Sequence, residues 1–339
     1  MNLTIVIPTY KRQDVLLNLV RYWNDSEFQV LILDGSPSSK KSIIKELSPN
    51  IKYFHFKNSI DDEICPIGSY FRRIKRGYEL VETKYALLGC DDEFYNKKIL
   101  KECMDQLEED NNYSSCMGSP YTIEIKKGEI KLKRTYKLIS SILDKISDQH
   151  IRALTYFSNY QPRNIYSVCK TDFARVLWNV FYNHRDLEIY AFYELFYEIS
   201  MTLKGSSKVL NKPYWIRGKN PQSKELPNVR IQNYIKEIKG VEKLNKLIAE
   251  LSNTLSNILK LSEESVSDYI KFCIYIYITN LPKKTNQNFL IKCCSKLSYE
   301  INIKRHNIKM IKHQKIINKL DKLEISELFD NKLKESLTI

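Results

Sequence analysis

Three short apolar runs near the start of the chain restrict its fold more than any other feature. Leu3–Ile7 is rich in β-branched side chains, and Phe28–Leu33 is apolar except for one glutamine. Tyr85–Leu88 consists of one tyrosine, one alanine and two leucines. Runs this short and this apolar are typical of strands buried on both faces of a sheet. Each run stops abruptly at polar or turn-forming residues, which predicts that a loop follows each strand.

Helical patterns separate these predicted strands. Asp14–Trp23 places its apolar residues on one helical face, Ser42–Leu47 favours a short helix, and Gly68–Val81 is typical of a basic helix. Ile51–Phe56 alternates like a further strand. Alternating strands and helices predict an α/β fold, with a mostly parallel, Rossmann-like sheet covered by helices on both faces.

Polar segments follow three of the predicted strands. They are the loop Thr9–Arg12, the turn that begins at Asp34, and the acidic sequence Asp91-Asp92-Glu93. Because ligands bind at the carboxyl ends of strands in such sheets, we expect these segments to meet at one edge of the sheet.

The rest of the chain has a different character. Between about residues 115 and 220, the pattern predicts a hairpin at Tyr121–Leu132 with its turn at Lys127-Gly128. It also predicts helices at Asp172–Phe181 and Leu187–Leu203. Two extended segments are expected at Lys208–Leu210 and Tyr214–Ile216. From about residue 230, apolar residues follow helical spacing, which predicts helices at 244–259, 266–278, 288–299 and 308–323. We therefore expect two parts: a domain over 1–220 and a basic all-helical region over 221–339.

Charge and composition exclude some classes of protein. The formal net charge is +14, and residues 231–339 contribute 19 Lys and Arg against 12 Asp and Glu, a net +7. The longest apolar run, Phe272–Ile278, is far shorter than the roughly 20 residues that span a bilayer. The N-terminus favours a strand over a signal peptide. We therefore predict a cytoplasmic protein whose basic tail contacts either the inner face of an anionic membrane or a second copy of the chain.

The eight cysteines form no Cys-x-x-Cys pair with the spacing of a zinc site. Without an export signal, cytosolic free thiols are the expected state. We interpret them as small core residues, Cys293-Cys294 included.

The acidic sequence Asp91-Asp92-Glu93 is the strongest candidate for chemistry. Three adjacent carboxylates at a strand end repel one another unless a cation or solvent compensates their charge. A divalent cation with oxygen ligands, Mg²⁺ or Mn²⁺, is the natural partner, and it would in turn hold a diphosphate. The alternative is an ordinary acidic turn or the first turn of a helix, where carboxylates are also favoured.

Three segments together resemble family 2 glycosyltransferases. Thr4–Arg12 resembles that family's opening strand and loop, Leu31–Ser36 resembles its second strand with an Asp-Gly-Ser turn, and Tyr85–Asp92 resembles the strand that leads to its Asp-x-Asp motif. They occur in the family's order and at about its spacing, and the resemblance covers roughly residues 1–220. The metal segment is similar to that of a bacterial subgroup ending in Asp-Asp-Glu-Phe.

The resemblance implies a GT-A fold and a metal-dependent, hexosyltransferase-type enzyme. The donor would be a nucleotide sugar, most simply a UDP-sugar held with Mn²⁺ or Mg²⁺. The acceptor would be a glycan or a lipid-linked molecule, as in the synthesis of a surface polysaccharide such as a capsule. By position, Asp34 would contact the nucleoside, and the base and ribose would lie beside the loop residues Pro8, Thr9, Tyr10 and Arg12.

The resemblance also assigns the acidic residues. Asp92 would ligate the metal, with Asp91 beside it or near the donor sugar. The chain departs from the family at Gly89 and Leu33, where Asp is frequent. That difference leaves open which carboxylate touches the metal.

The resemblance places a catalytic base on a later helix that ends at Gly205. Counting back from this glycine gives Glu194, with Glu188 and Glu198 as alternatives. Glu194 and Glu198 share a helical face, whereas Glu188 points elsewhere. Inverting enzymes of the family use such a carboxylate to take the proton of the acceptor hydroxyl.

Basic residues near these segments are candidates for binding the donor diphosphate. The run Arg72, Arg73, Lys75 and Arg76 precedes the acidic sequence, with Arg72 as the first candidate, and Arg217 follows the base helix. A solvated helix face is the alternative for the run. His184 is either a third metal ligand or an ordinary histidine.

Two other functions compete with the glycosyltransferase. A nucleotidyltransferase with a GT-A-like fold needs a glycine-rich loop near the first strand, and residues 8–16 contain no glycine. A nucleic-acid-binding protein would use the basic charge and the 23 tyrosines, but no recognised motif of that class is present. We therefore expect no nucleic-acid partner.

Overall fold

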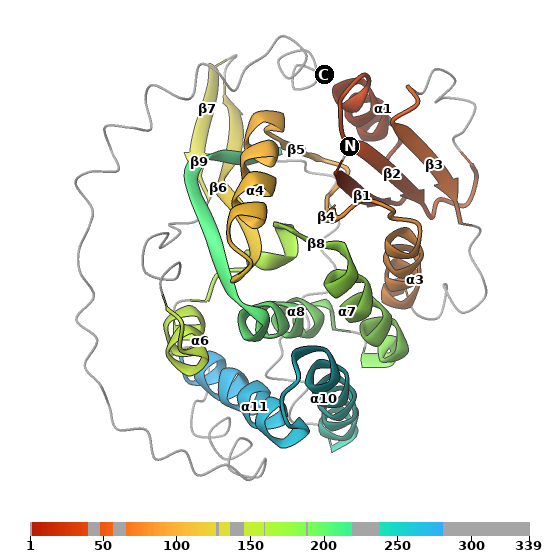
Figure 1. Cartoon of the computed structure of the whole chain (residues 1–339). Coiled ribbons are helices and arrows are strands. Elements are labelled where there is room, and N and C mark those ends of the chain that lie inside the picture. Colours follow the sequence, from red (N-terminus) through yellow and green to blue (C-terminus); the bar gives the residue numbers. More distant parts are fainter. Residues whose placement is uncertain are drawn as a thin grey trace.

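The computed structural model describes residues 2–39, 48–56, 66–126, 129–135, 146–158, 160–187, 189–218 and 238–280. Within these residues, nine strands form one sheet in the order β3-β2-β1-β4-β8-β6-β9-β5, with β7 paired to β6. Helices lie against both faces of the sheet, and a further helical layer lies beyond one of them (Figure 1). The predicted α/β class, with helices on both faces and a C-terminal helical region, is confirmed.

The first half of the sheet is parallel, as its apolar runs predicted. β1 (Leu3–Thr9) lies between β2 (Gln29–Asp34) and β4 (Tyr85–Leu88), and β3 (Ile51–His55) extends the sheet beyond β2. In this register Thr9 is opposite Asp34. The polar residues that end β1 and β2 therefore lie side by side.

The second half of the sheet mixes directions. β8 (Val168–Lys170) is antiparallel to both β4 and β6 (Tyr113–Lys126), and β6 runs parallel to β9 (Ser206–Gly218). β5 (Glu93–Tyr95) pairs with the end of β9. The predicted hairpin is confirmed, because β6 pairs antiparallel with β7 (Glu129–Arg134). The two predicted extended segments at 208–210 and 214–216 belong to one strand, β9.

Side chains of each strand alternate between two hydrophobic cores. Ile5 and Ile7 of β1 pack in the core beneath α1 (Gln13–Trp23) and α4 (Lys97–Glu109), whereas Val6 faces the opposite core. That opposite core is covered by α3 (Pro66–Glu79), α7 (Thr171–Asn183) and α8 (Tyr190–Lys204). Burial on both faces explains why these strands carry so few polar residues.

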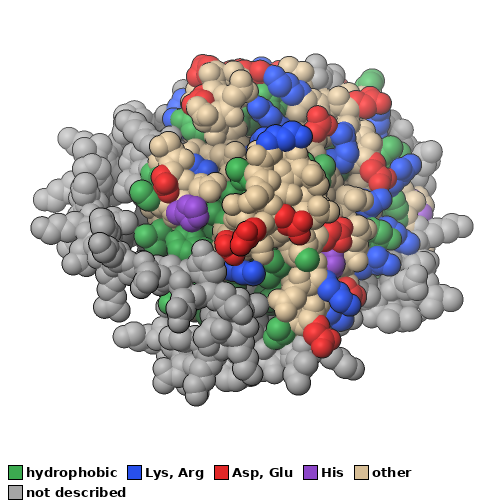
Figure 2. Space-filling view, turned by 60° about the horizontal axis from the view of Figure 1, so that its bottom comes forward, with side chains coloured by type: hydrophobic (Ala, Val, Ile, Leu, Met, Phe, Trp, Pro, Cys, Tyr) green, Lys and Arg blue, Asp and Glu red, His purple; other side chains and the backbone are tan. Residues whose placement is uncertain are grey.

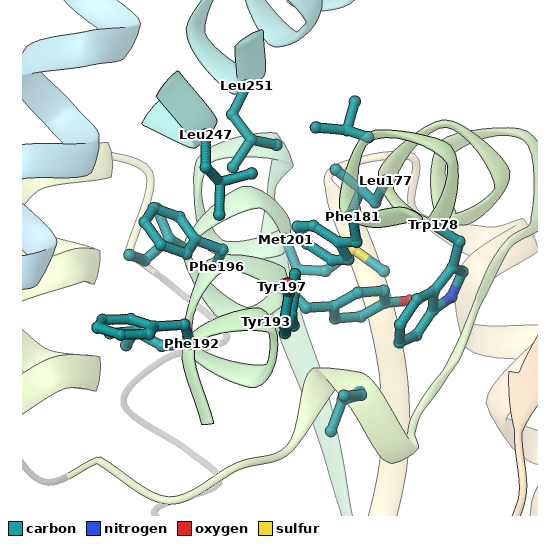
Figure 3. Packing of buried hydrophobic residues seen from close by; sticks show 14 of the residues in the cluster. Leu177, Trp178, Phe181, Phe192, Tyr193, Phe196, Tyr197, Met201, Leu247 and Leu251 are labelled. Atoms are coloured by element: carbon teal, nitrogen blue, oxygen red, sulfur yellow. The ribbon is translucent and has the colours of Figure 1, made fainter. Parts of the chain in front are cut away.

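The C-terminal helices extend the second core. α10 (Ile238–Leu259) packs against α7 and against α11 (Glu263–Thr279), and α11 packs against α8 and α6 (Gln149–Ser158). Leu247 and Leu251 of α10 face the side chains of α7 and α8 (Figure 3). The short 3-10 helices η1 (Asn164–Tyr166) and η2 (Arg185–Leu187) complete the elements.

Several predictions fall outside the described residues, namely the helices at 42–47, 288–299 and 308–323 and the turn at 127–128. Residues 238–280 contain five Lys and Arg and five Asp and Glu. The net positive charge of residues 231–339 therefore comes from residues 281–339. The described surface in Figure 2 shows basic and acidic side chains interspersed. None of the described helices combines the length and the apolar character needed to cross a bilayer.

Candidate functional site

The loops after β1, β2 and β4 meet, as the sequence predicted. The Thr9 hydroxyl donates to Asp91 Oδ2 over 2.7 Å, and the Gly35 backbone N–H donates to the Thr9 carbonyl over 3.0 Å. Lys11 has a positive φ of 57°, and its N–H donates to the Ser36 hydroxyl over 2.8 Å. Three segments that are distant in sequence therefore form one site at the carboxyl ends of the parallel strands.

Arg12 bridges the two aspartates of the acidic sequence. Its Nη1 donates to Asp91 Oδ1 over 2.5 Å and its Nη2 donates to Asp92 Oδ2 over 2.8 Å. Burial raises the pKa of Asp91 to about 6, although the Arg12 charge and the Thr9 hydrogen bond oppose this rise. The arginine thus supplies the positive charge that adjacent carboxylates require.

Asp34 lies buried beneath the same loops. Its Oδ1 accepts the Ser36 N–H over 2.8 Å and its Oδ2 accepts the Tyr53 hydroxyl over 2.6 Å. Pro8 is buried within β1, whereas Tyr10 is 41% exposed. The loop therefore offers an exposed aromatic ring next to a fixed carboxylate.

The basic run of α3 divides between solvent and the site. Lys75 and Arg76 form exposed ion pairs with Glu79, at 2.5 Å and 3.0 Å. Arg73 is buried and donates to the Ser69 hydroxyl, and its guanidinium lies so close to Gly35 that a Cβ there would be 2.1 Å from Nη1. Arg72, the residue singled out from the sequence, is half-buried. No local sequence pattern indicates that Arg73, rather than its neighbours, reaches the Asp34 turn.

Glu93 directly follows the two aspartates and is the first residue of β5. It is 1% exposed, and Arg217 lies opposite it on β9, with Arg217 Nε 3.1 Å from Glu93 Oε1. Burial raises the pKa of Glu93 to about 8, and the Arg217 charge opposes the rise. Glu93 is therefore an ion-pair partner of Arg217 rather than a third free carboxylate.

Glu194 lies on α8. It is half-buried, and the Tyr160 hydroxyl donates to its Oε1 over 3.2 Å. Burial and then the charge of Glu198 raise the pKa of Glu194 to about 7, while Tyr160 and Arg217 lower it. The Arg217 charge lowers the pKa of both Glu93 and Glu194.

The two alternatives to Glu194 are placed differently. Glu198 is fully buried and accepts hydrogen bonds from the Tyr156 hydroxyl, the Asn164 amide, and the backbone N–H groups of Arg163, Asn164 and Ile165. With these donors around it, Glu198 is an anchor within the fold and does not face an open site. Glu188 lies outside the described residues.

His184 is remote from the aspartates, because its Nε2 lies 2.6 Å from the Glu250 carboxylate of α10. Across the described parts of the chain, no three His, Cys, Asp or Glu side chains gather in a group that could hold a metal ion. Asp92 Oδ1 has no hydrogen bond to another described residue, and neither do the two carboxylate oxygens of the buried Glu93. Any metal here would need oxygen ligands from a bound molecule as well.

Comparison with known proteins gives matches to solved structures only. No protein-family model matches the sequence, and no curated protein does. The structure of S. aureus TarS is 14% identical with a TM-score of 0.48, covering 85% of this chain and 45% of that one. The chain therefore spans less than half the length of that protein.

Structures of a shorter S. aureus TarS segment, 1–349, also match. One is 13% identical with a TM-score of 0.47, and it covers 82% of this chain and 72% of that one. Another, in complex with UDP-GlcNAc, is 15% identical with a TM-score of 0.43, and it covers 83% of this chain and 82% of that one. Similarity at this level carries no information about the chemistry of the present chain.

Proposed function

We propose that the chain is a GT-A glycosyltransferase that moves a sugar from a nucleotide-diphosphate donor, most simply a UDP-sugar, to a glycan or lipid-linked acceptor. The observation that carries the proposal is the meeting of Thr9, Arg12, Asp91 and Asp92 at the carboxyl ends of the parallel strands, with Arg217 paired to the adjoining Glu93. Arg217 offers a cation for a diphosphate, and Glu194 offers a carboxylate with a pKa of about 7. Synthesis of a surface polysaccharide at the cytoplasmic side of the membrane is the biological setting that we propose.

The donor would bind along the loops that end the parallel strands. Asp34 and the exposed ring of Tyr10 suit a nucleoside, because one offers fixed hydrogen-bond acceptors and the other a face for stacking. Arg217 is 53% exposed while its Nε remains paired with Glu93, so its outer nitrogens are free to meet phosphate oxygens. Negative charge that develops as the nucleoside diphosphate leaves would be stabilised there.

The aspartates suit a metal that is shared with the donor. Asp92 would supply its carboxylate to Mn²⁺ or Mg²⁺, with Asp91 beside it, and phosphate oxygens would complete the coordination. Such an ion neutralises the diphosphate when bound. Arg12 holds both aspartates in the present structure, so it would have to share or release them as the ion binds.

Glu194 would act on the acceptor. In its deprotonated form it would take the proton of the acceptor hydroxyl as that oxygen attacks the anomeric carbon of the donor sugar. A single attack of this kind inverts the anomeric configuration. The hydrogen bond from the Tyr160 hydroxyl would hold the Glu194 carboxylate in place. Arg217 would face the departing diphosphate.

A thermal-shift series tests the donor and metal parts of this function. We expect UDP with Mn²⁺ to raise the melting temperature of the wild-type chain more than UDP, GDP, CDP or dTDP alone, because a ligand of the folded state stabilises it by RT ln(1 + [L]/Kd). Asp92→Asn should lose most of the Mn²⁺-dependent shift and abolish transfer.

Asp105→Asn is the matched control, since Asp105 is exposed on α4 and should respond like the wild type. Wild-type transfer that is insensitive to EDTA, or an Asp92→Asn variant with full activity, would contradict the metal-dependent function.

A further inference from the structure

Several tyrosines lie close to Glu194. Tyr160 hydrogen-bonds to its carboxylate, and the charge of Glu194 acts on Tyr166, Tyr190 and Tyr277 as well. In each of these three tyrosines, burial is the main cause of a raised pKa, and the value reaches about 12 for Tyr277. All four hydroxyls are therefore neutral at physiological pH and able to donate hydrogen bonds.

The rings of this cluster contact one another in pairs. The Tyr160 and Tyr277 ring centroids are 4.9 Å apart in an edge-to-face arrangement, and Tyr166 lies 4.5 Å from the Trp215 ring. Tyr190 contacts Tyr70 at 5.8 Å. These pairs fix the orientation of each ring before any ligand arrives.

The tyrosines differ in exposure from the aromatic residues of the core. Tyr70, Tyr160, Tyr166, Tyr190 and Tyr277 are all partly exposed, whereas Tyr193 and Tyr197 on α8 are fully buried. All five pack against the edge of the same buried cluster. Part of each side chain therefore remains accessible to a bound molecule.

The cluster combines distant parts of the chain. Tyr70 belongs to α3, Tyr166 to η1 and Tyr190 to α8, whereas Tyr277 lies near the end of α11 in the C-terminal helical region. The contact between Tyr277 and Tyr160 is possible because α11 packs against both α6 and α8. The C-terminal helices thus reach within contact distance of the residue that bonds to Glu194.

We propose that Tyr70, Tyr160, Tyr166, Tyr190 and Tyr277 form the acceptor subsite, and that it binds an uncharged sugar ring with α11 supplying one wall through Tyr277. This inference rests on the proposed function and deepens it. Aromatic faces pack well against the C–H face of a sugar, and phenolic hydroxyls bond to its hydroxyl groups. The Glu194 carboxylate, in the deprotonated form that acts as a base, disfavours an anionic sugar beside Tyr160.

Sugar binding in the presence of UDP and Mn²⁺ tests the proposal without requiring turnover. The probes are the methyl glycosides of glucose, galactose and N-acetylglucosamine, with methyl glucuronide as the anionic member, titrated by saturation-transfer NMR. We expect at least one neutral glycoside to bind more tightly than the glucuronide. Tyr277→Ala should weaken that binding by about tenfold, the equivalent of roughly 1.4 kcal/mol of lost stacking, while UDP affinity changes less than twofold.

Two further variants separate binding from folding. Tyr277→Phe keeps the ring and should retain most of the affinity, and Tyr182→Ala removes a partly exposed tyrosine of α7 that contacts Lys75 and Arg185 and should bind like the wild type. The inference is overturned if UDP binds but no neutral glycoside does, if the glucuronide binds best, or if Tyr277→Ala binds the glycoside like the wild type. Failure of UDP itself to bind would instead overturn the proposed function.

Discussion

The environment of Glu194 combines two opposing influences on one carboxylate. Burial and the neighbouring Glu198 disfavour its charge, whereas the Tyr160 hydroxyl and Arg217 favour it, and the balance leaves its pKa at about 7. A base is most effective when its pKa is near the working pH, because it is then both ionised and basic enough to take a proton. Glu194 meets that requirement, whereas Glu198 on the next turn is enclosed by donors.

Replacing this carboxylate tests its role directly. Glu194→Gln keeps the shape of the side chain but cannot accept the acceptor proton, so we expect kcat to fall on the order of 10²–10⁴-fold with little change in UDP affinity. Glu102→Gln, an exchange at the partly exposed ion pair with Lys212, is the control and should keep wild-type kcat. A Glu194→Gln enzyme with near wild-type kcat, or a product that retains the donor's anomeric configuration, would contradict the assignment.

The pH profile provides an independent test of the same residue. Only the deprotonated carboxylate accepts a proton, so wild-type activity should fall as the pH drops through about 7 and level off above it. Measurement of kcat/KM between pH 5 and 9 would show this decrease in activity at acidic pH. A profile that is flat between pH 6 and 8 would mean that Glu194 does not limit the rate.

Residues of the site differ in how far the sequence predicts them. Thr9, Arg12 and Asp91 follow strand signals, so their meeting follows from the rule that parallel strands end at one edge. Glu93 and Arg217 are paired by the register of β5 and β9, which depends on contacts far apart in the chain. No local pattern distinguishes a carboxylate that will be buried from one that stays in solvent.

At the scale of elements, Glu198 and Asn164 connect α8 to the sheet. Three consecutive backbone N–H groups at residues 163–165 donate to Glu198, while the Asn164 amide oxygen accepts from the Ser115 hydroxyl of β6 and the Ser207 hydroxyl of β9. The helix that carries Glu194 is therefore fixed to η1 and, through Asn164, to β6 and β9. Tyr166, the last residue of η1, takes its position from the same bonds.

Removing this anchor should be costly for stability. Glu198→Ala leaves three buried N–H groups without an acceptor, and we expect a loss of about 3–5 kcal/mol in the free energy of unfolding, measured with urea. Glu198→Gln keeps one oxygen and should lose less. Glu79→Gln, at an exposed helical ion pair, should change stability by less than about 0.5 kcal/mol. Equal stabilities of Glu198→Ala and Glu79→Gln would show that the anchor has no such role.

Most elements with strong periodicity were predicted, although the amphipathic helix α4 was missed, and the shortest strands were not predicted. β1, β2 and β4 have continuous apolar runs, and the helices at residues 171–183 and 190–204 have wide apolar faces. β5 and β8 are three residues long, too short for any pattern to appear, and their pairing is set by longer strands on either side. The helix α6 also lacks a strong local signal, and its burial comes from α8 and α11.

For the whole molecule, the shared core links the C-terminal helices to the sheet. Leu244, Leu247 and Leu251 of α10 belong to the same buried cluster as Val6 and Leu33 of the parallel strands. The described helices after residue 238 therefore contribute to the core that stabilises the sheet. The sequence predicts helices here but not their packing, because an amphipathic face does not specify its partner.

Two substitutions on α10 test this continuity. Leu247 is fully buried, so Leu247→Ala should lower the free energy of unfolding by about 2–5 kcal/mol. Ile258 on the same helix is 37% exposed, and Ile258→Ala should cost far less. Both variants should unfold in a single transition when followed by tyrosine fluorescence and by circular dichroism. An early, separate loss of helix in Leu247→Ala would mean that α10 is an independent unit.

The late position of β9 in the chain determines when the site can form during synthesis. A ribosome releases the N-terminal strands first, so β1 to β4 can assemble while residues 206–218 are still being made. Until β9 emerges, β5 lacks its antiparallel partner and Glu93 remains accessible to water. The strand that excludes water from Glu93 also carries Arg217, so the carboxylate loses its hydration only when its counter-ion arrives. A nascent chain therefore never has to bury this charge alone, which avoids an intermediate that would be costly to populate.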